Sequence, residues 1–529
     1  MNNLNELLRT RSQYELLRVV EREARELKLS VYAVGGFVRD AILGRPTVDL
    51  DFVVLGHGEG IRLAESVSRR LNGSMAHVYP KFGTAAVRSG DTVLEFVAAR
   101  RESYRADSRK PIVEDGTLQD DLLRRDFTIN TLAISLRGEL PFGELIDTFG
   151  GLVDIDAGRI RTPRPAAATF ADDPLRMIRA ARFAAQLNFR VSINTRKAMR
   201  QEAQRIGIVS QERITDELHK IMESPKPSIG LRILEEVGLL REIIPELSAL
   251  RGVDTVAGQR HKDNFFHTLQ VVDNVVATAS PDKYWLRWAA LFHDIAKPRT
   301  KRFVSGTGWT FHGHEDRGAR MVAKLFKKLR LPLDERMDYV RKLVALHHRP
   351  VALVDDEVTD SAIRRLLFDA GEDIEDLMTL VRADITSRNP NRVQRYLQAF
   401  DSVEKKFAEV EAKDHLRNFQ PPLDGQEIME VVGIKAGVAV GIIKDAVREA
   451  ILDGKIPNEH AAAFALMTEI KDDALRRAKL YEEVVLPMRG DERRVAYALK
   501  QEIMGGDIPE DHQAALAHLM ALKSRLLVV

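Results

Sequence analysis

The sequence predicts an α/β head followed by a long all-helical body. Short segments rich in β-branched residues, each bounded by glycine or charged turns, predict strands at residues 31–34, 48–54, 84–89 and 92–98. The segment 60–71 between them has the apolar spacing of a helix. Beyond about residue 165 nearly every apolar pattern has helical spacing. A chain of 529 residues is longer than one hydrophobic core usually supports, so we expect several domains.

Composition excludes several classes of site. The chain has no cysteine, which rules out disulfides, cysteine-ligated zinc and iron–sulfur clusters. The net charge is only +2 with 80 Lys and Arg residues, so any surface that binds nucleic acid must be local. The N-terminus mixes charges through its apolar positions, and no apolar run reaches the roughly 18 residues of a membrane span. We therefore expect a cytoplasmic protein without a membrane partner.

Two proline-containing segments predict breaks in the helical part. Residues 224–228 hold two prolines within three positions, and residues 418–422 end on a proline pair. The predicted divisions are a head at 1–140, a helical neck at 141–225, a helical body at 226–417, a tail at 418–470 and a C-terminal extension at 471–529.

The head carries a pattern that suits metal-assisted nucleotidyl transfer. Asp49 and Asp51 alternate along a predicted strand, so both carboxylates point to one face, where Mg²⁺ could lie between them. Upstream, Gly35 and Gly36 follow a strand and precede a helix expected to start near Phe37, a turn that lets backbone N–H groups approach a phosphate. Glu95, on another strand, is the best third ligand. Each motif alone is common, but their ordered combination is much more specific.

These residues resemble a known family. VGGFVRDAILGRPTVDLDFVV at 34–54, RRDFTIN at 124–130 and FADDPLRMIRAARFAAQL at 170–187 resemble class II tRNA nucleotidyltransferases and bacterial poly(A) polymerases, which share a polymerase-β-like nucleotidyltransferase head. The resemblance extends to about residue 470. It implies addition of CCA to tRNA 3′ ends from CTP and ATP with Mg²⁺. It also implies that residues 141–225 carry the base-reading helix and that residues 418–470 bind tRNA.

The resemblance assigns nucleotide contacts to Gly35, Gly36, Arg39 and Arg125, together with Asp126 and Asn130. We expect the last two to share one face of a helix, where an acceptor and a donor could read the ribose 2′-hydroxyl.

The same resemblance assigns recognition of the incoming base to Asp173 and Arg176. We expect these two residues to lie three positions apart in one helix. A carboxylate accepts from the amine of cytosine or adenine, while a guanidinium donates to the adjacent ring nitrogen; UTP and GTP mismatch both groups. Here Asp172 stands where the family usually has Glu. Arg179 and Arg182 continue the face and are expected to contact the triphosphate or the primer end. The alternative for both arginines is a solvated basic stripe.

Residues 100–121 are polar and rich in turns and charge. They resemble the family's flexible loop, which is needed for the switch from C to A addition. Their presence therefore favours adding A.

The body holds a histidine and aspartate pattern for a second metal. His267, His293, Asp294 and Asp384 resemble the signature of HD phosphohydrolases, with His312, His314, His347 and His348 lying between them. An Asp within an apolar helix is costly without a metal or a partner. Imidazole and carboxylate ligands together suit Mn²⁺, Fe²⁺, Ni²⁺ or Mg²⁺. In this the chain resembles the HD-bearing branch of the family, and the resemblance implies that its HD domain carries phosphatase or cyclic phosphodiesterase activity.

Two alternatives remain open. One is an A-adding enzyme or a poly(A) polymerase, because these share the head motifs. The other is an HD phosphohydrolase with an RNA-binding head. Nothing in the sequence predicts the oligomeric state.

The C-terminal region contains an internal repeat. Residues 446–467 and 498–520 align at an offset of 52, matching Ile456-Pro457 with Ile508-Pro509 and His460 with His512. We predict two copies of one helix–turn–helix unit, the second of which lengthens the tRNA-binding surface or mediates self-association.

Overall fold

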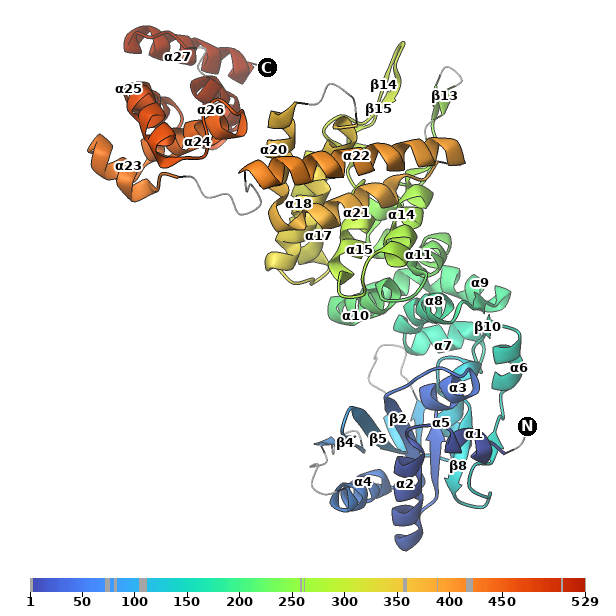
Figure 1. Cartoon of the computed structure of the whole chain (residues 1–529). Helices are drawn as coiled ribbons and strands as arrows, with labels where there is room; N and C mark the ends of the chain where they lie inside the picture. The colour runs from blue at the N-terminus through green and yellow to red at the C-terminus, as the bar shows by residue number, and fades with distance from the viewer. Residues whose placement is uncertain are drawn as a thin grey trace. The chain divides into compact units, whose positions relative to one another are not determined.

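The computed structural model describes residues 3–71, 77–79, 83–103, 112–256, 259–260, 262–354, 359–387, 389–414, 422–505 and 508–528 (Figure 1). The chain forms two compact units, Met1–Val344 and Ala345–Val529. Among the described residues, no helix is both long enough and apolar enough to cross a membrane.

The head is built on a seven-stranded mixed sheet in the order β3-β4-β5-β2-β1-β8-β9. Strands β2 and β5 are its parallel pair, and the other neighbours are antiparallel. The bounds are β1 (Val31–Val34), β2 (Asp49–Val54), β3 (His77–Tyr79), β4 (Thr84–Ser89), β5 (Thr92–Ala98), β8 (Ala133–Arg137) and β9 (Leu145–Ile146). The four strands expected from the sequence are all present.

The two faces of the sheet have different roles. Leu50, Phe52 and Phe96 are fully buried, and the two phenylalanine rings stack with centroids 4.9 Å apart. Helices α2 (Tyr14–Glu26) and α4 (Glu59–Arg70) pack against the sheet. Because side chains alternate along β2, burying Leu50 and Phe52 turns Asp49 and Asp51 to the opposite face. Three further helices complete the head: α1 (Asn5–Arg9), α3 (Gly36–Ile42) and α5 (Leu118–Leu123).

The neck and the first part of the body continue the same compact unit. Their helices are α6 (Gly151–Asp156), α7 (Ala166–Asp172), α8 (Leu175–Leu187), α9 (Ile193–Glu202), α10 (Gln211–Met222), α11 (Pro227–Glu236), α12 (Leu239–Ile243), α13 (Pro245–Ser248), α14 (Asn264–Thr278), α15 (Tyr284–Phe292), α16 (Lys297–Thr300), α17 (His314–Lys328) and α18 (Glu335–Leu346). A hairpin of β14 (Arg302–Val304) and β15 (Gly308–Thr310) follows α16.

Specific contacts join the neck to the body. The Tyr284 hydroxyl accepts a hydrogen bond from Trp288 Nε1 at 3.0 Å and bonds to His219 Nδ1 of α10 at 2.5 Å. Residues 223–226 form the turn between α10 and α11, which begins at Pro227, and the Ser228 N–H donates to Asp273 of α14 at 3.1 Å. The first unit therefore runs through the break expected near residue 225.

The second unit is helical in its described part. It contains α19 (Arg349–Ala352), α20 (Asp360–Ala370), α21 (Ile374–Asp384), α22 (Pro390–Asp414), α23 (Gly425–Val432), α24 (Val438–Leu452), α25 (His460–Val484), α26 (Ala496–Gly505) and α27 (His512–Val528). The linker expected at residues 418–422 lies outside the described residues except for Pro422.

The repeat extends further than the two expected helix pairs. α24 with α25 and α26 with α27 form the pairs, and each has its own core. Buried residues recur 52 positions apart: Ile428 and Leu480, Val447 and Leu499, Ile451 and Ile503, Ala463 and Ala515, Met467 and Leu519. The first of these matches pairs α23 with the C-terminal half of α25. A single 25-residue helix therefore ends one copy and begins the next.

Candidate active site and candidate metal centre

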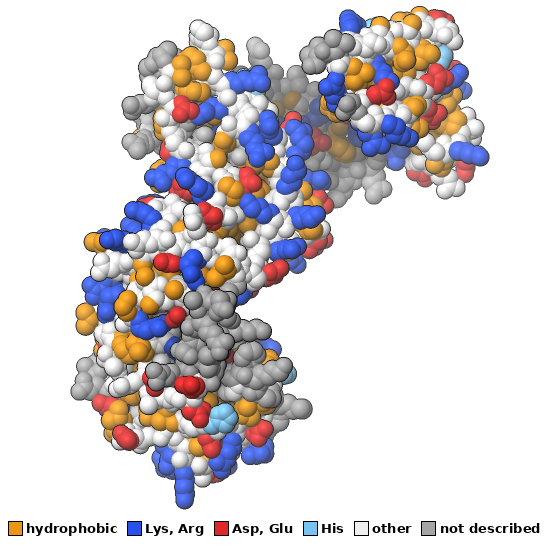
Figure 2. Space-filling model, turned by 180° about the vertical axis from the view of Figure 1, so that it is seen from behind, with side chains coloured by type: hydrophobic (Ala, Val, Ile, Leu, Met, Phe, Trp, Pro, Cys, Tyr) orange, Lys and Arg blue, Asp and Glu red, His pale blue; other side chains and the backbone are white. Residues whose placement is uncertain are grey.

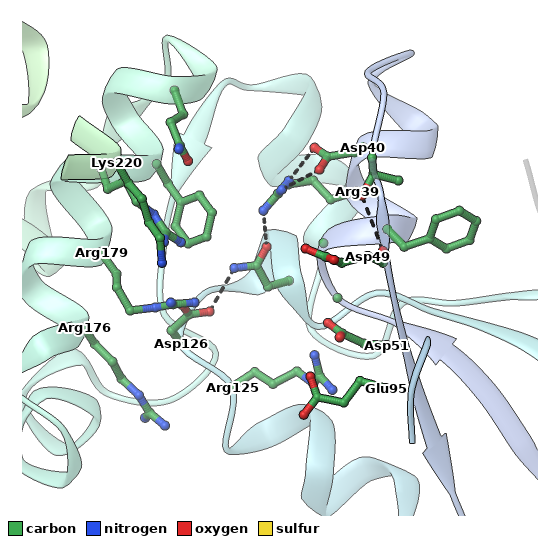
Figure 3. Close-up of a pocket in the computed structure, with 18 of the residues that line it drawn as sticks. Arg39, Asp40, Asp49, Asp51, Glu95, Arg125, Asp126, Arg176, Arg179 and Lys220 are labelled. Atoms are coloured by element: carbon green, nitrogen blue, oxygen red, sulfur yellow. Dashed lines mark hydrogen bonds and ion pairs between the residues drawn. The ribbon is translucent and has the colours of Figure 1, made fainter. Parts of the chain in front are cut away.

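Three carboxylates meet on the strands of the head. Parallel pairing of β2 with β5 puts Asp51 beside Glu95, and Asp49 lies two residues earlier on the same face (Figure 3). Burial raises the pKa of Asp51, with a further rise from Asp49, although Arg125 opposes it. Burial also raises the pKa of Glu95, and the nearby Asp51 and Asp49 charges raise it further. Oxygen ligands that repel one another in this way form a donor set that fits Mg²⁺.

Gly35 is required where the first strand meets this site. Its φ is +74°, a left-handed conformation that side chains strongly disfavour. A Cβ there would also lie 2.7 Å from Arg125 Nη1 and 3.4 Å from Asp51 Oδ2. The helix after it begins at Gly36.

A chain of polar contacts crosses the opposite wall of the cleft. Arg39 pairs with Asp40 at 2.8 Å and donates to Asn130 Oδ1 at 2.7 Å. Asn130 donates to Asp126 at 2.9 Å, and Asp126 accepts from Arg179 Nε at 2.8 Å (Figure 3). Burial opposes ionisation of Asp126, but Arg179 and the bond from Asn130 hold its pKa well below the usual range. Asp126 therefore stays charged and fixes both of these neighbours.

The expectation that Asp126 and Asn130 share an α-helix is wrong. Helix α5 ends at Leu123, and residues Thr128–Asn130 form a short 3₁₀ turn. The Asp126 carboxylate accepts from the Phe127 N–H at 2.8 Å, a local bond that competes with helical hydrogen bonding. The two side chains still contact each other, because the 3₁₀ turn brings Asn130 close enough to donate to Asp126.

Arg182 is built into the neck. Its side chain is only 8% exposed, pairs with Glu217 at 3.1 Å and lies 4.2 Å from the centre of the Phe183 ring. Burial and then the nearby Arg179 lower the pKa of Arg182 to about 10. The solvated-stripe alternative is therefore wrong for this residue.

Asp173 and Arg176 lie at the start of α8, not both within a helix. Asp173 is extended (φ −142°, ψ 103°) because Pro174 follows, and its carboxylate caps α8 by accepting from the Leu175 N–H at 3.2 Å. Arg213 of α10 holds the other carboxylate oxygen at 2.8 Å. Arg176 donates to the Arg124 carbonyl at 2.7 Å. Asp172 pairs with Arg164.

These residues line one cleft of about 750 Å³ between the head and the neck. Asp49, Asp51 and Glu95 come from the strands, and Arg176, Arg179 and Arg182 come from α8 (Figure 3). Sequence reasoning missed Arg213 and Lys220, which also line this cleft, and Glu217, which pairs with Arg179 and Arg182. Their spacing along α10 puts all three on one helical face, a signal that the sequence contained.

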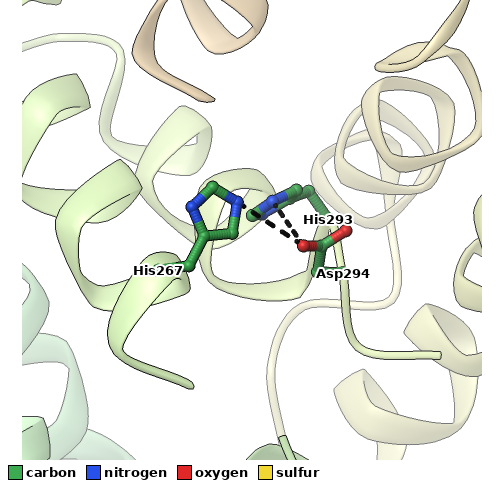
Figure 4. A group of neighbouring side chains, drawn as sticks. All are labelled: His267, His293 and Asp294. Carbon is green, nitrogen blue, oxygen red and sulfur yellow. Dashed lines mark ion pairs between the residues drawn. The ribbon is translucent and has the colours of Figure 1, made fainter. Parts of the chain in front are cut away.

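A second cluster lies on the body helices. Asp294 Oδ2 is 3.2 Å from His293 Nε2 and 3.6 Å from His267 Nε2, and all three residues are buried (Figure 4). His314, at the start of α17, places its Nε2 3.4 Å from Asp294 Oδ1. Although burial opposes ionisation, His293 and Lys297 hold the pKa of Asp294 well below its usual range.

Two of these histidines, His293 and His314, are oriented as metal ligands usually are. His293 Nδ1 lies 2.8 Å from the Ala290 carbonyl, and His314 Nδ1 lies 2.9 Å from the Phe311 carbonyl. A proton on each Nδ1 leaves Nε2 as a lone-pair donor toward Asp294, so the cluster fits a divalent ion. Sequence reasoning placed His314 near the motif but not among the ligands.

Four other residues belong to the motif expected from the sequence. His312 and His348 are exposed, and His347 is buried. His347 and Asp384, which ends α21, belong to the second unit. The role of Asp384 as a ligand stays a prediction.

Comparison with known proteins shows the family. Residues 31–161 match the poly(A) polymerase head domain, residues 188–250 the probable RNA and SrmB-binding site of polymerase A, and residues 264–389 the HD domain. A CC-adding tRNA nucleotidyltransferase of Thermus thermophilus is 32% identical over 443 residues, covering 82% of this chain and 93% of that protein. The chain belongs to the tRNA nucleotidyltransferase family.

Members of the family are named for different activities. An A-adding tRNA nucleotidyltransferase of Deinococcus radiodurans is 31% identical, with 82% of this chain and 94% of that protein covered. A solved tRNA nucleotidyltransferase complexed with a primer tRNA and an incoming ATP analogue is 27% identical, with a TM-score of 0.50 over 73% of this chain and 99% of that one. These tRNA nucleotidyltransferases thus include both partial reactions.

Proposed function

We propose that this chain adds CCA to tRNA 3′ ends from CTP and ATP without a nucleic-acid template. The observation that carries the proposal is a single cleft with two walls. Asp49, Asp51 and Glu95 lie on one wall, and the other, which we call the arginine wall, carries most of the arginines together with Asp173. In this scheme the 3′-hydroxyl of the RNA attacks the α-phosphorus, a new phosphodiester forms and pyrophosphate leaves. Mg²⁺ held by Asp49, Asp51 and Glu95 would lower the pKa of that hydroxyl and stabilise the leaving pyrophosphate.

The arginine wall would hold the nucleotide. Arg39, Arg125, Arg179 and Arg182 supply positive charge for the triphosphate on a frame fixed by Asp126 and Glu217. A charge fixed before the substrate arrives needs no reorganisation during the reaction.

Base choice would come from Asp173 and Arg176. Arg213 orients the Asp173 carboxylate, and the Arg124 carbonyl orients Arg176. The pair would accept from an exocyclic amine and donate to a ring nitrogen, a pattern that cytosine and adenine share and that uracil and guanine lack.

The segment that the resemblance links to the switch from C to A favours the full reaction. Its described parts, β6 (Arg100–Ser103) and β7 (Ile112–Asp115), pair as a hairpin. Residues 104–111 lie outside the described residues.

Incubation with tRNA lacking CCA tests the proposal. We expect CTP alone to add two residues, and CTP with ATP to complete CCA. Addition that stops after CC with both nucleotides present would make the chain CC-adding. Addition of A only to tRNA already ending in CC would make it A-adding, and repeated A addition would make it a poly(A) polymerase.

We also propose a metal-dependent phosphohydrolase at His267, His293, Asp294 and His314, because His293 and His314 each direct a free Nε2 toward the buried Asp294. A transition metal or Mg²⁺ there would activate water and polarise a phosphoryl oxygen. Lys297 holds Asp294 at 2.7 Å and keeps that carboxylate charged. Release of inorganic phosphate from adenosine 3′-phosphate, lost with chelator and restored by Mn²⁺ or Ni²⁺, would support this activity.

A further inference from the structure

A pocket of about 340 Å³ lies beside the candidate metal centre. Four arginines line it, Arg299, Arg302, Arg317 and Arg320, together with Thr300 and Thr310. Among the described residues that line it there is no Asp or Glu. The residues come from α16, the β14–β15 hairpin and α17.

The Phe311 carbonyl connects this pocket to the metal centre. It accepts from the Thr300 hydroxyl at 3.4 Å and lies 2.9 Å from His314 Nδ1. Lys297, which pairs with Asp294, also lies over the Phe311 ring at 5.5 Å. His312 and Gly313, which line the pocket, directly precede His314 in the chain. One wall of the pocket is therefore linked to a candidate metal ligand through the Phe311 carbonyl.

The four arginines carry charge that their described surroundings do not neutralise. Within the described part of the chain, Arg299, Arg302, Arg317 and Arg320 form no ion pair with a carboxylate; Arg317 donates to the Arg299 carbonyl at 3.2 Å. The nearby Asp254 pairs instead with Lys301, and Glu315 lies against His314. All four side chains are exposed and so available to a ligand. Convergent guanidinium groups without acidic partners are suited to phosphate.

We propose that this arginine pocket binds a second phosphate of the molecule hydrolysed at the metal centre. The proposal rests on the phosphohydrolase function above and names its substrate class, an RNA 3′ end bearing a terminal phosphate. The terminal phosphate lies at the metal centre, and the neighbouring phosphodiester lies among the arginines. In the reaction, water attacks the terminal phosphorus, the bond to the ribose 3′-oxygen breaks, and that oxygen takes a proton. A mononucleotide has no phosphate to fill the pocket.

A pair of probes tests this proposal: the dinucleotide ApAp, which ends in a 3′-phosphate, and adenosine 3′-phosphate. We expect a KM about tenfold lower for ApAp, from charge-assisted contacts to its internal phosphate. The double variant Arg302→Gln/Arg320→Gln should remove that preference. Lys324→Gln, on an exposed part of α17 outside the pocket, is the matched control and should keep it. Calorimetric binding of both probes to metal-free protein gives a readout that does not depend on catalysis.

The outcomes separate the pocket from the hydrolase. Hydrolysis of both probes with equal KM, together with equal ApAp binding by the wild type and the double variant, would overturn the pocket and leave the hydrolase standing. Failure to hydrolyse either probe, with ApAp binding that the double variant loses, would keep the pocket and overturn the hydrolase. Circular dichroism of the double variant checks that it is folded.

Discussion

Asp51 lies where its own charge is unfavourable until a cation arrives. Burial and the neighbouring Asp49 raise its pKa, and they raise that of Glu95 as well. The folded protein therefore keeps protons there that the unfolded chain has already released. In metal-free solution, ionisation of these two carboxyl groups therefore lowers the free energy of unfolding as pH rises through their folded-state pKa values. Below the unfolded-state pKa values both states are protonated, and the effect is absent.

The substitution Asp51→Asn separates catalysis from stability. We expect nucleotide addition to fall to background, because one of the three ligands is lost. We also expect the metal-free variant to unfold in urea at the same concentration as the wild type or a higher one at neutral pH, with the difference shrinking in acid. Asp91→Asn, in the exposed turn between β4 and β5, is the control and should leave addition intact. Measurable addition by both Asp49→Asn and Asp51→Asn would contradict the metal assignment.

Arg176 tests the base-reading proposal at the same scale. We expect Arg176→Ala to lower discrimination of CTP and ATP over UTP and GTP by about 1–3 kcal/mol, since one bidentate reader is lost. The ratios of kcat/KM for the four nucleotides give this number. Lys197→Ala, an exposed charge on α9, serves as control. Unchanged ratios in Arg176→Ala would mean that the base is read elsewhere.

At the scale of elements, the second copy of the tail repeat differs from the first in its charge. The buried residues of the first copy end at Ala474, and those of the second begin at Leu480. The exposed Arg493 and Arg494 stand in the second copy where the first has Gly441 and Ile442. Basic residues at these positions favour contact with RNA phosphates.

A stop codon after residue 478 removes every core residue of the second copy and keeps those of the first. We expect tRNA affinity to fall about tenfold and its salt dependence to weaken, because a few phosphate contacts are lost. Binding titrations at two salt concentrations measure both effects, and Arg493→Gln/Arg494→Gln should reproduce part of them. An unchanged affinity with a lower mass by light scattering would instead assign the second copy to self-association.

At the scale of the whole molecule, we propose separate chemistry for the head and the HD segment. We expect His293→Ala/Asp294→Ala to abolish divalent-dependent phosphohydrolysis while nucleotide addition stays within about twofold, since none of its residues lines the head cleft. Parallel assays of both reactions on one preparation provide the measurement. Loss of addition in a folded double variant would mean that the HD segment supports the head.

Much of this organisation could be predicted from the sequence, because local patterns determine it. Alternation along β2 gives the common face of Asp49 and Asp51, and the order of motifs gives the family. What could not be predicted depends on contacts distant in sequence. Arg213 reaches Asp173 across 40 residues, and Glu217 fixes Arg182 across 35. The extended Asp173 could have been foreseen from Pro174, whereas the turn at Asp126 depends on a carboxylate that accepts from the N–H of the next residue, Phe127.

The continuity of α25 through both cores of the tail affects how the tail opens. Two separate helical hairpins could unfold one at a time. Here the junction between the two copies is the helix α25, whose backbone hydrogen bonds continue from one copy into the next. Opening the first copy would have to disrupt α25, which also holds the first helix of the second copy. The two copies should therefore behave as one cooperative folding unit. Amide protons near the middle of α25, between Ala474 and Leu480, should then be the last in the tail to exchange with deuterium, and those of α27 near the chain end should be among the first.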